Sequence, residues 1–295
     1  MNLHDYLKEK TASVELALDS ILGEDLGRAS ILKEAMRYSV FAGGKRLRPV
    51  LVIAAAEAVG GREEDVITAA CAIELIHTYS LIHDDLPAMD DDDFRRGRPT
   101  NHKVYGEAIA ILAGDALLTK AFEVLAGCSV PGDDGRVMLR VIREIAAAAG
   151  ARGMVGGQAV DILSEGKPVD AATLLAIHKN KTGALLRAAV RTGAILAGAG
   201  EEELAALTSF AEEFGLVFQI TDDILNVVGD SAIMGKPVGT DVQRAKATYP
   251  ALYGLAGARQ RARAGRERAL AALSPFDAKA DPLRLLVNYL LEREK

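Results

Sequence analysis

Apolar residues recur at spacings of three and four along most of the chain, which is the period of one face of an α-helix. In the N-terminal part the pattern runs through Leu16, Leu18 and Ile21 and then through Ile31, Leu32 and Met36. It predicts further helices over residues 67–82, 109–125, 137–149, 171–197, 201–228, 249–273 and 282–292. Because no segment alternates convincingly at period two, the predicted fold class is all-α.

The chain has 295 residues, and 49% of them are apolar, which is ample for a large core. Glycine and proline separate the helical segments, but no Pro- or Ser-rich linker divides the chain. We therefore expect one domain over residues 1–295. The segment 67–82 is almost unbroken in its apolar character, which predicts a helix buried on most sides.

Composition excludes several classes of protein. The net charge of -6, from 35 basic and 41 acidic residues, argues against nucleic acid as a partner. Cys71 and Cys128 lie in apolar sequence, so we expect buried free thiols rather than a disulfide framework. The charged N-terminus lacks a signal peptide's apolar region, and the apolar runs fall short of the roughly 20 residues of a membrane span. We expect a cytoplasmic protein with no membrane span.

Six aspartates occur within ten positions of the stretch LIHDDLPAMDDDDFRRGRPT. Pro87 ends or kinks the preceding apolar helix, so the group lies at a helix C-terminus, where negative charge opposes the helix dipole. Like charges at this spacing also repel one another. We expect a bound cation to neutralise Asp84, Asp85 and Asp90, and we interpret residues 91–93 as a solvated acidic turn.

A second aspartate pair, Asp222 and Asp223, stands inside an apolar helix in QITDDILNVVGD. Glu74 precedes the first pair by ten residues, and Glu212 precedes the second by ten. The repeat is too short to establish a duplication. It does predict two similar helices that each present an aspartate pair, with Asn226 one turn after Asp222 on the same face.

The candidate ligands are oxygen atoms with no cysteine or histidine cluster, which favours Mg²⁺ over Zn²⁺. Mg²⁺ commonly bridges a few carboxylates to substrate phosphates. Arginine offers a diphosphate forked donors and lysine offers it a point charge. Short basic segments next to glycine supply both types, at Lys45, Arg46, Arg48, Arg95, Arg96, Lys179, Lys181 and Lys236.

Together these motifs resemble the trans-isoprenyl diphosphate synthase family. The pattern Asp-Asp-x-x-x-x-Asp followed by Arg-Arg-Gly resembles the first aspartate-rich motif of that family. The segments GGKRLRP, PTNHKVYGE, LAGDALL, GGQAVDI, KTGAL and FQITDDILNVVGD match the family in the same order. The resemblance covers nearly the whole chain and looks strongest to short-chain bacterial farnesyl diphosphate synthases.

The resemblance implies a helical bundle around a deep central pocket, and usually a homodimer. It also implies a head-to-tail condensation. An allylic diphosphate, dimethylallyl or geranyl, loses diphosphate to give an allylic cation, and the double bond of isopentenyl diphosphate attacks that cation. A proton then leaves with the departing diphosphate.

For the metal, the resemblance assigns Asp84, Asp90 and Asp222 as Mg²⁺ ligands, with Asp85 and Asp223 in support. It implies three ions per active site, with Mn²⁺ as a substitute. Family members usually carry an aspartate at the end of the second motif. Here that position is Asn226, whose amide oxygen can bind a water but brings no charge.

The other roles also follow from the resemblance. The residues expected to hold the allylic diphosphate or lie near the cation are Arg95, Lys181, Thr182, Gln219 and Lys236. Those expected to hold isopentenyl diphosphate are Lys45, Arg48, His77 and Arg96. Gln158 and Asp161 are expected to order metal-bound water. Without the resemblance, His77 in its apolar helix would be interpreted as a core histidine.

Product length depends on the helix that precedes the first motif. Tyr79 lies five residues before Asp84, roughly 7–8 Å deeper at 1.5 Å per residue. Its ring is the bulkiest group in that stretch, whereas the neighbouring Ser80 is small. We therefore expect Tyr79 to form the floor of the pocket, and the family resemblance implies that a bulky residue at this position stops growth at fifteen carbons. A core tyrosine with a hydrogen-bonded hydroxyl is the other interpretation.

Several other functions stay open at this point. The first is a geranylgeranyl diphosphate synthase, and a second is a non-catalytic regulatory subunit, although such a subunit is expected to lose site residues. A terpene cyclase would not need Lys45, Arg48 and Arg96. A cation-buffering protein would explain residues 90–93 but not the spaced lysines and arginines.

Overall fold

The computed structural model describes residues 1–130, 132, 134–228 and 247–292, and within these ranges nearly all regular structure is helical. The first half contains α1 (Leu3–Ile21), the short η1 (Gly27–Ala29), α2 (Ser30–Val40), α3 (Leu47–Ala58), α4 (Glu63–Asp84), α5 (Asn101–Tyr105) and α6 (Glu107–Ala126). The second half contains α7 (Arg136–Ala149), α8 (Met154–Ser164), α9 (Ala171–Ile177), η2 (His178–Gly183), α10 (Ala184–Leu196), α11 (Glu201–Val228), α14 (Tyr249–Ala272), η3 (Ala278–Ala280) and α15 (Asp281–Glu292). The predicted all-α class is confirmed.

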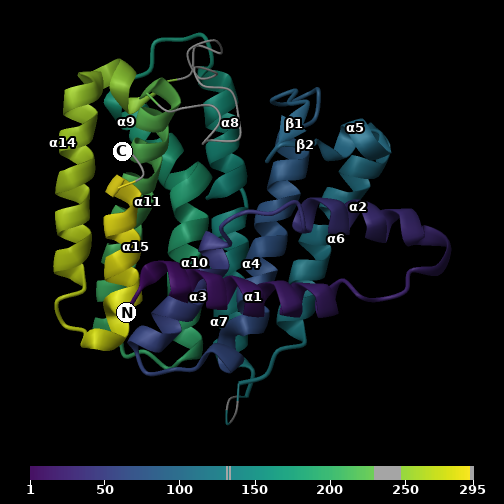
Figure 1. Cartoon of the computed structure of the whole chain (residues 1–295), viewed down its shortest axis with the longest axis horizontal. Coiled ribbons are helices and arrows are strands. Elements are labelled where there is room, and N and C mark those ends of the chain that lie inside the picture. Colours follow the sequence, from purple (N-terminus) through teal and green to yellow (C-terminus); the bar gives the residue numbers. More distant parts are fainter. Residues whose placement is uncertain (131, 133, 229–246, 293–295) are drawn as a thin grey trace.

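Helix α4 is the central helix of the bundle. It packs against α3 and α6, while α10 packs against α3 and α11 (Figure 1). By length and composition α4 could cross a membrane, yet 67% of its most apolar window is buried inside the fold. Its apolar content is therefore accounted for by core packing.

Three features differ from the sequence prediction. A short antiparallel hairpin, β1 (Phe94–Arg95) with β2 (Arg98–Pro99), follows the first acidic motif. The helix predicted over 171–197 is three elements, because the π-helical η2 separates α9 from α10. The helix predicted over 249–273 is kinked, since Gly254 has a φ of 68°.

The helices approach closely where side chains are small. A Cβ at Gly193 of α10 would lie 1.9 Å from the carbonyl oxygen of Val52 in α3, so only glycine permits this contact.

Cys71 is fully buried and Cys128 is partly buried, and both are free thiols. Cys71 therefore has the buried environment that the sequence predicted, whereas Cys128 is less buried than expected.

A buried ion pair ties α3 to α4. Arg46 is 2% exposed, and its guanidinium donates to Oε1 of Glu74 at 3.0 Å and to the carbonyl of Val40 at 2.6 Å. Glu74 is also 2% exposed. By contrast Glu212, its counterpart in the predicted repeat, is exposed on α11 and accepts from Arg187 at 3.2 Å. The two glutamates of the repeat therefore have different environments.

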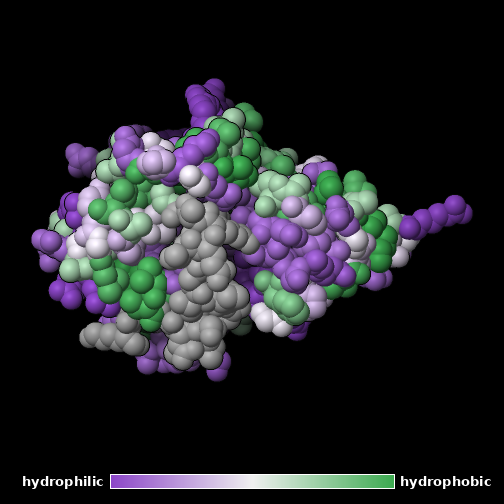
Figure 2. All heavy atoms as spheres, turned by 90° about the horizontal axis from the view of Figure 1, so that it is seen from above, coloured by the Kyte–Doolittle hydropathy of each residue, from purple (hydrophilic) through white to green (hydrophobic). Residues whose placement is uncertain are grey.

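The bundle opens at one end. The β1–β2 hairpin lies there, together with α8 and α9, at the top of Figure 1. Figure 2 views the molecule from this side, and hydrophilic residues gather on the surface beside the atoms drawn in grey. This end carries the first acidic motif, because α4 reaches it with its C-terminus.

Candidate active site

The loop after α4 folds back onto the end of that helix. The backbone N–H of Asp90 donates to the carbonyl of Asp84 at 2.8 Å, and that of Asp92 donates to Asp85 at 3.2 Å. These bonds satisfy carbonyls that the helix leaves unpaired at its C-terminus. As a result, Asp84, Asp90 and Asp92 line one cavity together. Asp92 lines the cavity while its side chain stays 36% exposed, so its interpretation as part of a solvated turn stays a prediction.

This cavity, which we call the acidic cavity, has a volume of about 380 Å³ and lies between the end of α4 and α11. Most of the predicted site residues line it. They are Arg48, His77, Asp84, Asp90, Arg95, Asp161, Lys181, Thr182, Gln219, Asp222 and Asp223. Segments more than a hundred residues apart thus bring Asp84 of the first pair and both aspartates of the second to one cavity.

Charge is unbalanced on the α4 side of the acidic cavity. Burial raises the pKa of Asp84 to about 6, and the charges of Asp90 and Asp85 act in the same direction. Lys181 and Arg95 oppose this rise but do not cancel it. The carboxylate therefore lacks sufficient positive charge around it, which is the condition that a bound cation relieves.

Asp85 has a different environment from Asp84. It is 3% exposed and accepts hydrogen bonds from two donors of Arg95, Nε at 2.7 Å and Nη2. Burial nevertheless outweighs Arg95 and raises the pKa of Asp85. Because Arg95 also lines the acidic cavity, Asp85 fixes the position of that guanidinium.

The wall opposite α4 is formed by η2 and α11. Lys181 donates to Asp161 of α8 at 2.6 Å, and the Thr182 hydroxyl donates to Oε1 of Gln219 at 2.8 Å. Asp222 and Gln219 lie on the cavity side of α11. Thr182 and Gln219 both line the cavity, and their expected role as oxygen donors near the allylic cation stays a prediction.

Sequence reasoning overlooked His178. Its Nε2 lies 3.2 Å from Oδ2 of Asp223, and its ring stacks on Tyr249 at a centroid distance of 5.5 Å. The backbone N–H of Tyr249 also donates to Asp223 at 2.8 Å. His178 stands in the motif HKNKTG, three residues before Lys181, and this position in the motif could have identified it as a site residue. Asp223 is thus partnered by protein groups, from η2 and from the start of α14.

A second cavity, which we call the basic pocket, adjoins the first. It has a volume of about 170 Å³, and Lys45, Arg48, His77 and Arg96 line it. Arg48, His77 and Phe218 line both cavities. All four residues predicted to hold isopentenyl diphosphate therefore meet at one place.

The two glycines before Lys45 make room for Arg96. Gly43 has a φ of 89°, and its carbonyl accepts from the Arg96 guanidinium. A Cβ at Gly44 would lie 2.6 Å from the same guanidinium. Lys45 itself is exposed and lies 3.3 Å from the Tyr289 hydroxyl of α15.

Burial and mutual repulsion act on the charges of the basic pocket. Burial lowers the pKa of Arg48 to about 10; the charge of Glu74 opposes this shift, and the charge of Arg96 adds to it. The pKa of His77 falls well below its usual value, first because of burial and then because of the surrounding arginines. His77 is therefore neutral at pH 7, while the arginines stay charged, and Glu74 is the carboxylate whose charge acts on both Arg48 and Arg96.

The remaining predicted residues lie elsewhere. Tyr79 is 7% exposed and packs edge-on against His83 at 5.7 Å, while Ser80 donates to the carbonyl of His77 at 2.8 Å. Neither belongs to the lining of the acidic cavity, so their role in product length stays a prediction. Gln158 is partly buried on α8, and its Oε1 has no hydrogen-bond partner among the described residues. Lys236 lies outside the described residues.

The donor set of the acidic cavity suits Mg²⁺. Asp84, Asp90 and Asp222 present carboxylate oxygens to one space, and the raised pKa of Asp84 marks a deficit of positive charge there. A tighter group of ligand atoms, within 4.8 Å of one another, occurs at Asp91, Asp93 and His102. That group does not line the acidic cavity, and Asp93 is paired with Lys103 at 2.6 Å, so the acidic cavity is the better candidate for a metal site.

Comparison with known proteins agrees with this geometry. The chain matches the polyprenyl synthetase family over residues 29–279. It is 50% identical over 266 residues to the farnesyl diphosphate synthase of Escherichia coli (strain K12), covering 89% of each chain. It is 45% identical over 295 residues to the geranylgeranyl diphosphate synthase of Cyanophora paradoxa, covering 99% of this chain and 97% of that protein.

A solved structure gives the same result for the fold. The geranylgeranyl pyrophosphate synthetase of Pyrococcus horikoshii superposes with a TM-score of 0.90 at 33% identity, over 99% of this chain and 98% of that one. The family match covers most of the chain and includes both aspartate motifs. The chain therefore belongs to the polyprenyl synthetase family and is a prenyltransferase of isoprenoid biosynthesis.

Proposed function

We propose that this prenyltransferase is a Mg²⁺-dependent farnesyl diphosphate synthase, which adds isopentenyl diphosphate to dimethylallyl and then to geranyl diphosphate. One observation carries the proposal. The acidic cavity and the basic pocket share Arg48, His77 and Phe218, so two diphosphates can lie side by side with their carbon chains in contact. Such positioning of two reactants is itself a large part of catalysis.

The allylic diphosphate belongs in the acidic cavity. Asp84, Asp90 and Asp222 would hold Mg²⁺, which supplies positive charge to the departing diphosphate. Arg95 and Lys181 line the same cavity and would take up charge that develops as the allylic carbon–oxygen bond breaks. Asp85 and Asp161 keep these two cations in position through the ion pairs described above.

Isopentenyl diphosphate belongs in the basic pocket. Lys45, Arg48 and Arg96 would bind its diphosphate, and neutral His77 would add a hydrogen bond without adding charge. The isopentenyl double bond then attacks the allylic cation to form the new carbon–carbon bond, and the departing diphosphate accepts the proton that is lost. Phe218 keeps water from the space between the two substrates.

Product length rests on Tyr79. Its ring is buried on α4 below Asp84, and family resemblance favours fifteen carbons when this position is bulky. The test incubates the protein with Mg²⁺, isopentenyl diphosphate and each allylic primer, followed by chromatography of the products. We expect farnesyl diphosphate from the native enzyme and a shift toward geranylgeranyl diphosphate in Tyr79→Ala.

The matched control is Tyr79→Phe, which keeps the ring and removes only the hydroxyl. It should still stop at fifteen carbons. If Tyr79→Ala stays active and also stops at fifteen carbons, Tyr79 is not the floor of the pocket.

A geranylgeranyl diphosphate synthase is the second candidate. One observation favours it: the Tyr79 ring packs against His83 and does not belong to the lining of the acidic cavity. A native enzyme that makes mainly twenty-carbon product in the same assay would select this candidate.

We also propose that the enzyme is a cytoplasmic homodimer. Ile111 and Leu112 of α6 are 43% and 52% exposed, which is apolar surface that a second copy can cover. Leu112→Glu should then give a monomer in size-exclusion chromatography with light scattering. The control Leu163→Glu changes an exposed leucine on α8 and should stay dimeric. An unchanged mass for Leu112→Glu would place the interface elsewhere.

A further inference from the structure

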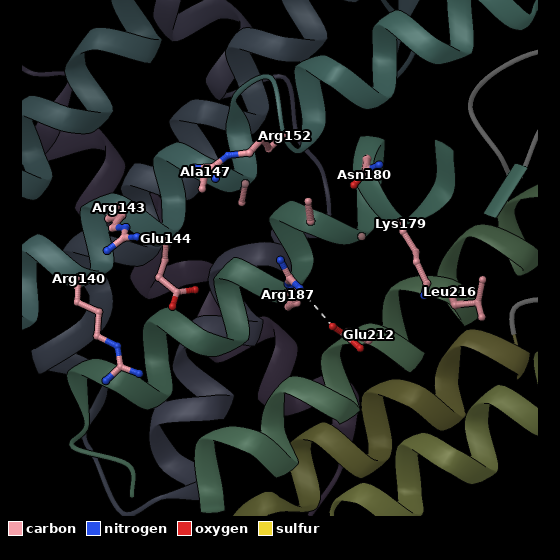
Figure 3. Close-up of a pocket in the computed structure, with 13 residues that line it drawn as sticks. Arg140, Arg143, Glu144, Ala147, Arg152, Lys179, Asn180, Arg187, Glu212 and Leu216 are labelled. Atoms are coloured by element: carbon pink, nitrogen blue, oxygen red, sulfur yellow. Dashed lines mark hydrogen bonds and ion pairs between the residues drawn. The ribbon is translucent and has the colours of Figure 1, made fainter. Parts of the chain in front are cut away.

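A third cavity lies on the side of η2 that faces away from the acidic cavity. It has a volume of about 690 Å³ and opens between α7, α10 and α11 (Figure 3). We call it the outer cavity. Five cationic side chains line it, namely Arg140, Arg143, Arg152, Lys179 and Arg187. The basic motif HKNKTG therefore divides its lysines, with Lys181 in the acidic cavity and Lys179 in the outer one.

Acidic residues do not balance these cations. Glu144 lines the outer cavity but is held by Arg191 at 2.7 and 2.6 Å, and Glu212 pairs with Arg187 at 3.2 Å. The hydrogen bonds from Arg191 lower the pKa of Glu144, and the charges of Arg140 and Arg187 lower it further. Positive potential thus persists in the cavity after both of its carboxylates are engaged.

Three of the five cations of the outer cavity have no carboxylate partner among the described residues. In the part of the chain that the structure describes, Arg143, Arg152 and Lys179 form no ion pair within 4.0 Å. Figure 3 shows Arg143 on α7, Arg152 just beyond the end of that helix and Lys179 on η2, around the same hollow. A cleft lined by charges of one sign concentrates ions of the opposite sign. These three cations around one cavity favour a ligand with several negative charges.

We propose that the outer cavity is a second anion site that binds a diphosphate-class ligand outside the catalytic cavities. Guanidinium groups pair with phosphate through two parallel hydrogen bonds, and a lysine adds a point charge. Ala147, Ala184 and Leu216 also line the cavity, so there is apolar surface for a short carbon tail. Inorganic diphosphate and prenyl diphosphates share the required chemistry.

The same geometry couples the outer cavity to catalysis. Lys179 and Asn180 line the outer cavity, while His178, Lys181 and Thr182 of the same π-helical segment line the acidic cavity. Close packing holds η2 from behind, because a Cβ at Gly157 would lie 2.2 Å from the backbone nitrogen of Lys181. An anion bound by Lys179 therefore shifts the position of η2, and with it the position of Lys181 in the acidic cavity. Single π-helical turns inside helices often mark functional segments.

Binding is tested first, without metal or substrate, so the result does not depend on the product of the enzyme. Inorganic diphosphate is titrated into the full-length protein in EDTA by calorimetry. We expect two classes of site, the basic pocket and the outer cavity. Arg143→Glu/Arg152→Glu should lose one class, with affinity falling at least tenfold, whereas Arg96→Gln should weaken the other. The titration is then repeated with farnesyl diphosphate. Tighter binding of farnesyl diphosphate at the outer cavity would identify a prenyl diphosphate as the ligand, and equal or weaker binding would identify inorganic diphosphate.

Arg263→Glu is the matched control, because Arg263 is an exposed arginine of α14 that lies outside all three cavities. It should bind diphosphate as the wild type does. If the Arg143→Glu/Arg152→Glu protein binds with the same stoichiometry and affinity as this control, the outer cavity is not an anion site.

Coupling is tested by steady-state kinetics with Mg²⁺. In the wild type, inorganic diphosphate should inhibit with a component that is noncompetitive against the allylic substrate. That component should disappear in Arg143→Glu/Arg152→Glu, while competitive inhibition at the catalytic cavity remains. An unchanged inhibition pattern in a variant that has lost the outer binding would overturn the coupling.

Discussion

Replacing Asp84 by asparagine should make the metal-free protein more stable while it removes catalysis. Asp84 closes α4 at the acidic cavity, where burial and the charges of Asp90 and Asp85 raise its pKa from 3.8 to about 6. An asparagine side chain has nearly the same shape but carries no charge. The variant therefore avoids the cost of ionising a carboxyl group in this environment.

The magnitude follows from the pKa shift. A rise from 3.8 to about 6 corresponds to about 3 kcal/mol of lost stability once the pH is above both values. Since Asp84 is partly exposed, solvent screening reduces the expected gain in the variant to roughly 1–3 kcal/mol. The native state holds the proton more tightly than the unfolded state, so wild-type stability recovers as the pH falls from about 6 toward 4. The advantage of the variant should disappear below about pH 4.

The assay is urea denaturation in EDTA at pH 8 and at pH 4. The control Asp25→Asn changes an exposed aspartate whose hydrogen bond from the Gly27 N–H an amide oxygen can keep. It should change stability little at either pH. Adding Mg²⁺ should stabilise the wild type but not Asp84→Asn, because the ion binds only the folded carboxylate site. A variant no more stable than wild type at pH 8 in EDTA would refute the reasoning.

Three further predictions concern residues in or beside the elements that form the two cavities. Arg46→Met should lower the free energy of unfolding by about 3–5 kcal/mol, because it leaves Glu74 buried without its partner. Arg46→Met/Glu74→Leu should recover most of that loss in the same denaturation assay, and no recovery would contradict the ion-pair account. Gly44→Ala should raise the KM for isopentenyl diphosphate more than the KM for the allylic substrate, since its methyl group meets the Arg96 guanidinium; equal changes in both would count against it. Asn226→Asp should shift the Mg²⁺ requirement modestly in a metal titration and leave the product unchanged, whereas a new product would show a different role.

Helical periodicity predicted most of the fold because apolar faces dictate where helices pack. It could not reveal η2, since a π-helical turn changes the hydrogen-bond pattern without changing the apolar spacing. The consequence is specific: Lys179 and Lys181 are two residues apart in one basic motif, yet they line different cavities. Only the backbone geometry separates them.

The candidate site was predictable where a motif brings its residues together and less so where tertiary contacts decide. Asp84 and Asp222 were predicted from their charge within apolar helices. The partners of Asp223, by contrast, come from His178 and from the backbone of Tyr249, which sequence spacing does not connect. Asp92 likewise lines the acidic cavity because its loop folds back, with its backbone N–H donating to the carbonyl of Asp85.

The central claim is that two adjoining cavities hold the two diphosphates. A crystal structure with Mg²⁺, isopentenyl diphosphate and a non-hydrolysable allylic analogue tests it most directly. We predict the analogue's diphosphate and the metal between Asp84 and Asp222 and the isopentenyl diphosphate on Arg48 and Arg96, with the carbon chains meeting beside Phe218. Isopentenyl diphosphate bound away from Arg48 and Arg96, or metal absent from Asp84 and Asp222, would contradict the account.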